Sequence, residues 1–189
     1  ADVGQYGPVE DTPVDKARYQ FEVNLFGLAR ITQLLLLDMR AKGKGLVINI
    51  SSMGGKIYTP LGAWYHATKH ALEGWSDCLR MELKPHRIDV VIIEPGLIGT
   101  EFIDGVGDQF AVAENSAYAE MAAKMQRASN AGRTPMSPPA VISNLVMTAI
   151  QSSKPKTRYV GGALARPMMI LRQILPDRWF DRILMSQLK

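Results

Sequence analysis

The sequence predicts an α/β protein with a parallel sheet, because three neighbouring segments alternate in type. Residues 45–52, GLVINISS, form a short apolar run rich in β-branched side chains, and residues 88–96, IDVVIIEPG, repeat that composition. Both runs are typical of strands that are buried on both faces. Residues 62–84 between them have helical spacing and must stop before Pro85. A strand, a helix and a second strand make a crossover unit, so the two strands should be parallel.

A long helix should precede the first strand, over residues 14–42. Its apolar positions at helical spacing are Phe21, Leu25, Leu28, Leu35 and Met39. We expect Thr12 to act as the N-cap, Pro13 to take the first helical position and Gly43 to end the helix.

The pattern is less regular after the second strand. Residues 97–133 mix glycines, methionines and apolar side chains such as Phe102 and Ile103 without a clear period, as in an irregular or partly helical lid. A helix capped at Ser137 and a third strand over residues 157–162 should follow.

Residues 165–189 form a basic amphipathic tail. Its apolar side chains are flanked by Arg166, Arg172, Arg178 and Arg182, which is the composition of a helix that lies at a membrane surface. A helix that docks on the substrate pocket or on a partner subunit has a similar pattern and is the more frequent case. The tail therefore predicts either peripheral membrane contact or docking.

Composition limits the class of protein. The chain has 189 residues, 47% of them apolar, which suits one core, and no linker or repeat divides residues 1–189 into separate domains. A net charge of +4 is too mild to indicate nucleic acid binding. The single cysteine, Cys78, fits a reducing compartment, so we expect a cytoplasmic protein. No segment resembles a signal peptide, and the longest apolar run, Leu34–Leu37, is far shorter than the ~20 residues of a membrane span.

Tyr65 and Lys69 should lie side by side, because they are one helical turn apart. The helix face that packs on the sheet continues from them through Leu72, Ser76, Leu79 and Leu83. Ser52 should lie at the same edge, since parallel sheets build their sites at the carboxyl ends of the strands. An adjacent ammonium lowers the pKa of a phenol, so Tyr65 could exchange a proton with an alcohol or carbonyl oxygen that Ser52 holds in place. Taken alone, Tyr-x-x-x-Lys is more often part of an ordinary helix packed on a sheet.

Four motifs in order resemble the short-chain dehydrogenase/reductase family, whose members move hydride between NAD(H) or NADP(H) and a carbonyl–alcohol pair. INISSMGG carries Ser52, and YHATK carries Tyr65 and Lys69, with the tyrosine thirteen residues after the serine, the interval usual in the family. NLFG carries Asn24, and PGLIGT resembles the family's P-G-x-x-x-T. The resemblance runs from about residue 7 to residue 159. It implies a partial doubly wound, Rossmann-like sheet with flanking helices, made of the last three strands of the family's sheet.

The resemblance implies a role for each matching residue. Tyr65 would be the general acid/base, Lys69 would lower its pKa and bind the nicotinamide ribose, and Ser52 would orient the substrate oxygen. Asn24 would hold a water that links Lys69 to solvent.

The same resemblance implies a nicotinamide site after the second strand. Pro95, Gly96 and Thr100 would line the nicotinamide, and Thr100 and the backbone of Ile98 would meet its carboxamide. The cofactor would be NAD or NADP. The choice between them stays open, because the residue that makes it lies in a part of the family's sequence that has no counterpart here.

Two departures from the family bear on function. The glycine-rich T-G-x-x-x-G-x-G loop for the pyrophosphate has no match, and Asp2 stands where glycine is usual, with Ala1 in register before it. We therefore expect an N-terminally truncated domain whose own activity is doubtful.

The predicted function is an NAD(P)-dependent oxidoreductase for a fairly apolar alcohol or carbonyl compound of the steroid, retinoid or fatty aldehyde type, homo-oligomeric at full length. The alternative is a catalytically silent, truncated relative that acts as an interaction or membrane-peripheral protein.

Two further features of the helix over residues 62–84 have weaker readings. His66 and His70, one turn apart, could form half of a metal site, but no third ligand is placed near them, so we expect no metal. Small residues share the helix face of Cys78; they are Ala67, Ala71 and Gly74. That face is a candidate subunit contact.

Overall fold

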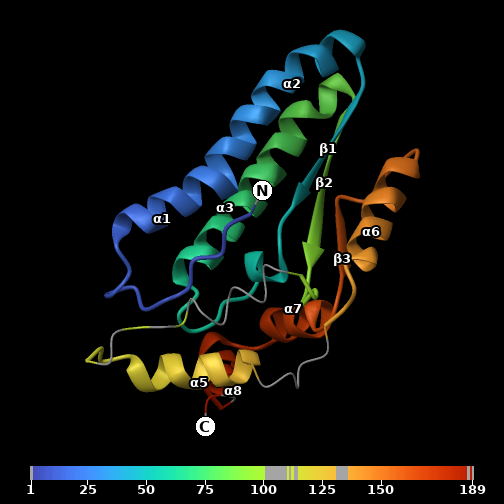
Figure 1. Ribbon diagram of the computed structural model, residues 1–189. Coiled ribbons are helices and arrows are strands. Elements are labelled where there is room, and N and C mark those ends of the chain that lie inside the picture. The colour runs from blue at the N-terminus through green and yellow to red at the C-terminus, as the bar shows by residue number, and fades with distance from the viewer. Residues whose placement is uncertain are drawn as a thin grey trace.

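A parallel sheet lies at the centre of the fold and has three strands among the described residues (Figure 1). The structure is a computed structural model and describes residues 2–100, 110, 112, 115–130, 136–186 and 188. The strands are β1 (Gly45–Ile50), β2 (Ile88–Pro95) and β3 (Arg158–Gly161), and they lie in the order β1-β2-β3. The predicted α/β class, the parallel crossover and the third strand are confirmed.

Helices cover both faces of this sheet (Figure 1). On one face lie α2 (Leu28–Lys42) and α3 (Ala63–Leu83), and on the other lies α6 (Ala140–Gln151). Successive β2 side chains serve the two layers: Val90 packs with Leu79 of α3, and Val91 packs with Ala149 of α6. The sheet is therefore packed between two apolar layers.

Strands β1 and β2 differ in how far they are buried. β2 is buried along nearly its whole length, as predicted. β1 is only half-buried and Ile50 is exposed, so the prediction that this strand is buried on both faces is wrong. Among the described residues β1 pairs along one edge only, with β2, and its other edge is left uncovered.

The long helix predicted over residues 14–42 is continuous but contains a π-helical turn. It consists of α1 (Val14–Phe21), η1 (Glu22–Gly27) and α2, with right-handed helical dihedral angles at both junctions, and it ends at Gly43 in the left-handed conformation. The predicted N-terminus is wrong by one residue, because Pro13 takes the cap position. Thr12 donates its hydroxyl to the carbonyl of Pro8 at 2.7 Å and so does not cap the helix.

The helix between β1 and β2 carries the predicted buried face. Its buried positions at helical spacing are Tyr65, Lys69, Leu72, Ser76, Leu79 and Leu83. It ends before Pro85, which lies in the short 3-10 helix η3 (Lys84–His86). Another 3-10 turn, η2 (Met53–Gly55), links β1 to the loop that leads into α3.

The chain after β2 differs from prediction at Ser137. α6 begins at Ala140 with Pro139 as its cap, while Ser137 forms an isolated bridge with Ile98, in the segment after β2. Ser137 therefore does not cap the helix. Within the predicted lid, α5 (Ala119–Asn130) is helical, whereas Phe102 and Ile103, like Ala1, lie outside the described residues.

The C-terminal tail packs on its own chain as α7 (Ala165–Ile174) and α8 (Asp177–Ser186). Phe180 of α8 is fully buried and meets the ring of Tyr58 edge-on at 5.3 Å. Part of the tail is therefore packed on its own chain, although Ile174 and Trp179 remain exposed. Docking on the substrate pocket or on a partner subunit stays a prediction. No helix in the described part of the chain has the length and apolar character needed to cross a membrane.

Candidate active site

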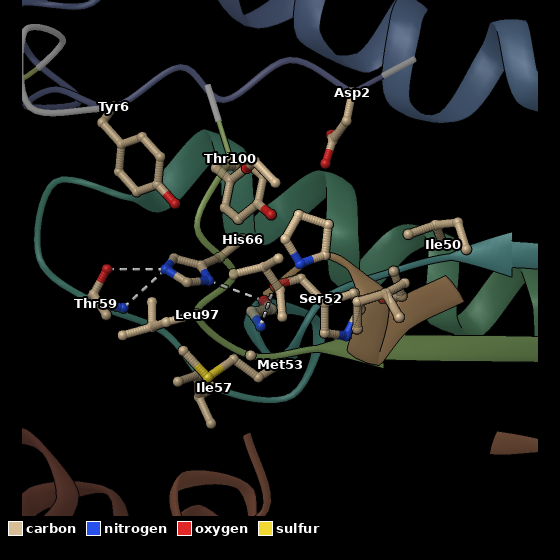
Figure 2. A pocket seen from close by; sticks show the side chains of 18 of the residues that line it. Asp2, Tyr6, Ile50, Ser52, Met53, Ile57, Thr59, His66, Leu97 and Thr100 are labelled. Carbon is tan, nitrogen blue, oxygen red and sulfur yellow. Dashed lines mark hydrogen bonds between the residues drawn. The ribbon is translucent and has the colours of Figure 1, made fainter. Parts of the chain in front are cut away.

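A cavity of about 540 Å³ opens where β1 and β2 end (Figure 2). Ser51 and Ser52 line it after β1, Pro95 and Gly96 line it at the end of β2, and Tyr65 lines it from the first turn of α3. The two strand ends and the helix start therefore meet at one edge, as predicted. The wall is largely apolar, with Met53, Ile57, Leu97, Ile98 and Ile142 among its residues.

Tyr65 and Ser52 face each other in this cavity. The Tyr65 side chain is nearly buried, with a residue exposure of 5%, and it shares a hydrogen bond with Ser52. Ser52 is extended, and its hydroxyl also accepts the amide N–H of Gly54 at 3.0 Å, which fixes the side chain at the start of η2. One serine hydroxyl thus orients the turn and contacts the phenol.

Lys69 is buried behind Tyr65 and is paired with a carboxylate. Its Nζ lies 2.9 Å from Oδ2 of Asp2, donates to the carbonyl of Ile50 at 3.3 Å, and lies 5.8 Å from the centre of the Tyr65 ring. The pKa of Tyr65 is raised, which is opposite to the direction predicted from Lys69. Burial is the main cause and the negative charge of Asp2 adds to it, while the hydrogen bond with Ser52 acts in the opposite direction.

Asn24 is buried in the π-helical turn and connects two distant segments. Its side chain accepts the amide N–H of Val3 at 2.9 Å and donates to the carbonyl of Val3 at 2.8 Å. It also donates to the hydroxyl of Thr68 on α3 at 3.2 Å. These bonds join the N-terminal segment to α3, and the water link to Lys69 implied by the family resemblance stays a prediction.

The residues predicted to hold the nicotinamide lie together on the cavity wall; they are Pro95, Gly96, Ile98 and Thr100. Gly96 is required there by close packing. Its amide N–H donates to the carbonyl of Gly161 at 2.8 Å, and a Cβ at this position would lie 2.2 Å from the carbonyl oxygen of Ala163. The cavity wall therefore has bare backbone directly after β2.

His66 shapes the cavity and shows no sign of metal ligation. Its Nδ1 lies 2.9 Å from the carbonyl of Gly54, and its Nε2 lies 3.1 Å from the amide of Thr59. A carbonyl can only accept and an amide N–H can only donate, so the ring is neutral with its proton on Nδ1. Burial lowers the pKa of His66, which agrees with this neutral form. In the described part of the chain, no group of three or more metal-ligating side chains is assembled.

Tyr6 lines the cavity and was not predicted from the sequence as a site residue. Its ring lies 5.3 Å from that of Tyr65, which also lines the cavity, and 5.4 Å from that of Phe110. Figure 2 shows Tyr6 pointing into the site from the N-terminal segment. The one sequence signal for it is an aromatic residue between two glycines near the start of the chain.

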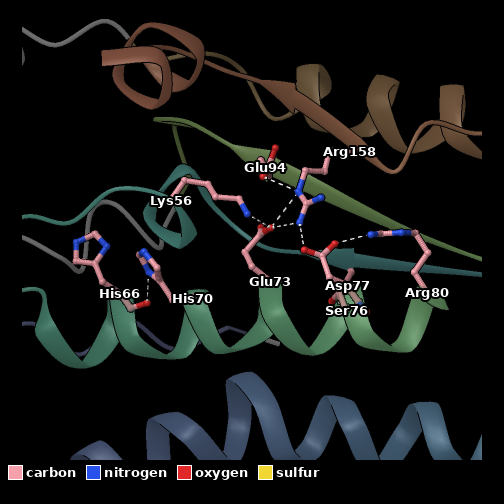
Figure 3. A network of polar contacts seen from close by, with 10 residues as sticks. Lys56, His66, His70, Glu73, Ser76, Asp77, Arg80, Glu94 and Arg158 are labelled. Carbon is pink, nitrogen blue, oxygen red and sulfur yellow. Dashed lines mark hydrogen bonds and ion pairs between the residues drawn. The ribbon is translucent and has the colours of Figure 1, made fainter. Parts of the chain in front are cut away.

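A partly buried charge network includes Glu94, the residue before Pro95, and was not predicted from the sequence (Figure 3). Glu73 of α3 binds Lys56 and Arg158, both at 3.0 Å. Arg158 also lies 2.7 Å from Asp77 and 3.3 Å from Glu94. Burial and the charge of Glu73 raise the pKa of Glu94 to about 7. This network connects α3, β2, β3 and the loop after η2.

Comparison with known proteins agrees with this geometry. The family model for short chain dehydrogenase matches residues 1–110. The chain is 34% identical over 190 residues to the "Probable short-chain type dehydrogenase/reductase VdlC" of Helicobacter pylori, which covers 97% of this chain and 67% of that protein. It is 33% identical over 193 residues to an NADPH-dependent 3-dehydrocapnine reductase of Ornithobacterium rhinotracheale, covering all of this chain and 68% of that protein.

A solved structure shares both the fold and part of the sequence. The short-chain dehydrogenase from Streptomyces avermitilis superimposes with a TM-score of 0.76 and 33% identity, over 92% of this chain and 62% of that one. The chain thus spans about two thirds of the length of these relatives. The family match and the shared arrangement of strands and helices show that this chain belongs to the short-chain dehydrogenase family.

Proposed function

We propose that this chain carries the substrate and proton-transfer site of an NAD(P)-dependent oxidoreductase that interconverts an alcohol and a carbonyl compound. The observation that carries the proposal is the hydrogen bond between the buried Tyr65 and the half-buried Ser52 on the wall of an apolar cavity. A relative is named as NADPH-dependent, which supports a nicotinamide cofactor and leaves NAD or NADP as the choice.

The residues divide the work of carbonyl reduction. Ser52 donates a hydrogen bond to the carbonyl oxygen and positions it beside Tyr65. A nicotinamide held beside Pro95, Gly96 and Thr100 would supply the hydride to the carbonyl carbon. The Tyr65 hydroxyl gives its proton to the oxygen as negative charge develops there, so hydride and proton together make the alcohol. Oxidation runs the same steps in reverse and needs Tyr65 as the base.

The cavity supports an apolar substrate. Its wall carries Met53, Ile57 and Leu97, and Tyr6 adds an aromatic surface beside Tyr65. Long aliphatic, steroid-like or retinoid-like carbonyl compounds fit this lining, because binding of such molecules gains mainly from buried apolar area.

Tyr65→Phe tests the proposal. Consumption of NADPH or NADH, followed at 340 nm with a panel of long-chain aldehydes and cyclic ketones, should fall at least 100-fold in the variant, because the phenyl ring still packs but cannot transfer a proton. Tyr19→Phe is the matched control, since Tyr19 is 62% exposed and lies outside the cavity. Turnover that survives Tyr65→Phe would contradict the assignment, as would equal loss in the control.

A catalytically silent relative is the second candidate. The observation that favours it is the pairing of Lys69 with Asp2, which engages the ammonium that the family resemblance assigns to the cofactor's ribose. Absence of NAD(H) and NADP(H) binding in calorimetry, together with a folded chain, would favour this candidate.

Two surfaces support proposals about partners. The outward face of α2 exposes Ile31, Leu34 and Leu37, and Cys78 and Gly74 are exposed on α3, so we propose that these helices contact a second copy of the chain. The exposed Ile174 and Trp179 beside basic residues support peripheral membrane contact of the tail. Cytoplasmic localisation stays a prediction.

A further inference from the structure

Asp2 lines the candidate site without a role in the family pattern. Its Oδ2 lies 2.9 Å from Nζ of Lys69, whose side chain is 3% exposed, while the side chain of Asp2 is 35% exposed. Figure 2 shows the carboxylate of Asp2 pointing from the N-terminal segment toward the cavity. A nearly buried ammonium thus has a partly shielded carboxylate as its ion-pair partner.

The surrounding residues hold Asp2 in this position. The next residue, Val3, is fixed at both of its backbone polar groups: its N–H donates to Asn24 at 2.9 Å, and its carbonyl accepts Asn24 and Gln20, each at 2.8 Å. Gln20 and Asn24 are both buried on the long helix. Asp2 is therefore held by hydrogen bonds that join the N-terminal segment to the long helix and by its ion pair with Lys69 of α3.

The ion pair changes the charge around Tyr65. The groups that face Tyr65 are Asp2 and Tyr6 from the N-terminal segment, Ser52 from η2, and His66 and Lys69 from α3. His66 is neutral, and the charges of Asp2 and Lys69 cancel. A phenolate at Tyr65 would therefore add an uncompensated negative charge to a nearly buried site, which burial disfavours.

We infer that Asp2 is a positioning residue that engages Lys69 and keeps Tyr65 in its neutral, proton-donating state, so that the site is set for carbonyl reduction. The reaction direction in this inference rests on the proposed function, whereas the electrostatic effect of Asp2 on Tyr65 does not.

The experiment measures the titration of Tyr65 directly in the full chain. Carbon-13 NMR of ring-labelled tyrosine reports each phenol separately, and Tyr65→Phe assigns the signal. In Asp2→Asn the titration of Tyr65 should move to lower pH by roughly one unit, because Lys69 is then free to stabilise the phenolate. Asp15→Asn is the matched control, since it makes the same chemical change in an exposed pair with Arg18 at 2.9 Å and should leave Tyr65 unchanged.

The outcomes separate this inference from the proposed function. An unchanged Tyr65 titration in a folded Asp2→Asn chain, or an equal shift in Asp15→Asn, would overturn the role of Asp2. A shift confined to Asp2→Asn supports it even if no substrate turns over, and only the proposed function then fails. Where alcohol oxidation is measurable, its pH–rate profile should move to lower pH by the same amount as the NMR titration. A profile that stays in place would remove Asp2 from the reaction.

Discussion

Replacing Glu94 by glutamine should stabilise the protein at alkaline pH and leave its stability at acidic pH nearly unchanged. Glu94 is fully buried, and its pKa rises from a usual value near 4.5 to about 7, because of burial and the charge of Glu73. Arg158 and Lys56 act in the opposite direction without cancelling the rise. Glutamine has the same shape and carries no charge at any pH.

The sign and size follow from proton linkage. Between pH 4.5 and about 7 the folded chain binds a proton at Glu94 that the unfolded chain releases. The contribution of the neutral carboxyl is therefore complete below pH 4.5 and is lost as the pH rises through about 7. A difference of this size corresponds to about 3 kcal/mol, at about 1.4 kcal/mol per pKa unit. The variant should thus be more stable than the parent by up to about 3 kcal/mol at pH 8.

Urea unfolding followed by circular dichroism, at half-unit steps from pH 5 to pH 8.5, measures this difference. Asp77→Asn is the control with the opposite sign. Burial works against ionisation of Asp77, yet hydrogen bonds from Arg158 and Arg80 leave its pKa lowered, so this variant should be less stable than the parent at pH 8. A parent that is more stable than Glu94→Gln at pH 8 would refute the reasoning, because the Glu94–Arg158 ion pair would then outweigh the cost of burying the charge.

Two further predictions concern the cavity. His66→Ala should destabilise by about 1–3 kcal/mol in urea unfolding, because Gly54 and Thr59 lose their partner. Since burial lowers the pKa of His66, its contribution in the parent is present above pH 6.5 and falls below it, and the variant should lack that pH dependence. Gly96→Ala should cost about 2 kcal/mol or more by the same assay, because the added methyl meets the Ala163 carbonyl, whereas Gly74→Ala, with open space around it, should not destabilise.

The parts of the fold that the sequence predicts are those written in local patterns. The two strands indicated by apolar, β-branched runs, the buried face of α3 and the end of that helix before Pro85 each depend on residues a few positions apart. All three predictions are confirmed. The same holds for the convergence of Ser52, Tyr65 and Gly96, because parallel strands that pair must end at a common edge.

The rest depends on contacts between residues far apart in the chain. Asp2 meets Lys69, and Arg158 meets Glu73 and Glu94, across separations that no local period encodes. The predicted direction of the Tyr65 pKa is wrong for this reason: burial, the main cause of the rise, and the carboxylate of Asp2, which adds to it, both come from residues far from Tyr65 in the chain, whereas Lys69 lies one helical turn away.

The π-helical turn at Glu22–Gly27 has a consequence for how this segment tolerates changes in length. A π-turn holds one more residue than an α-helical turn, so loss of a single residue would let the helix close into regular geometry without breaking it. The extra residue lies within this turn, so the helix on either side of it would keep nearly the same orientation, and the change would be confined to the turn. Asn24 lies in the turn and would lose its bonds to Val3, whereas Gln20, in α1, would keep its own. A one-residue deletion here should therefore yield a folded helix with a loosened N-terminal segment, whereas a deletion outside the helix, at the exposed turn of Val9 and Glu10, would leave the bonds of Asn24 in place.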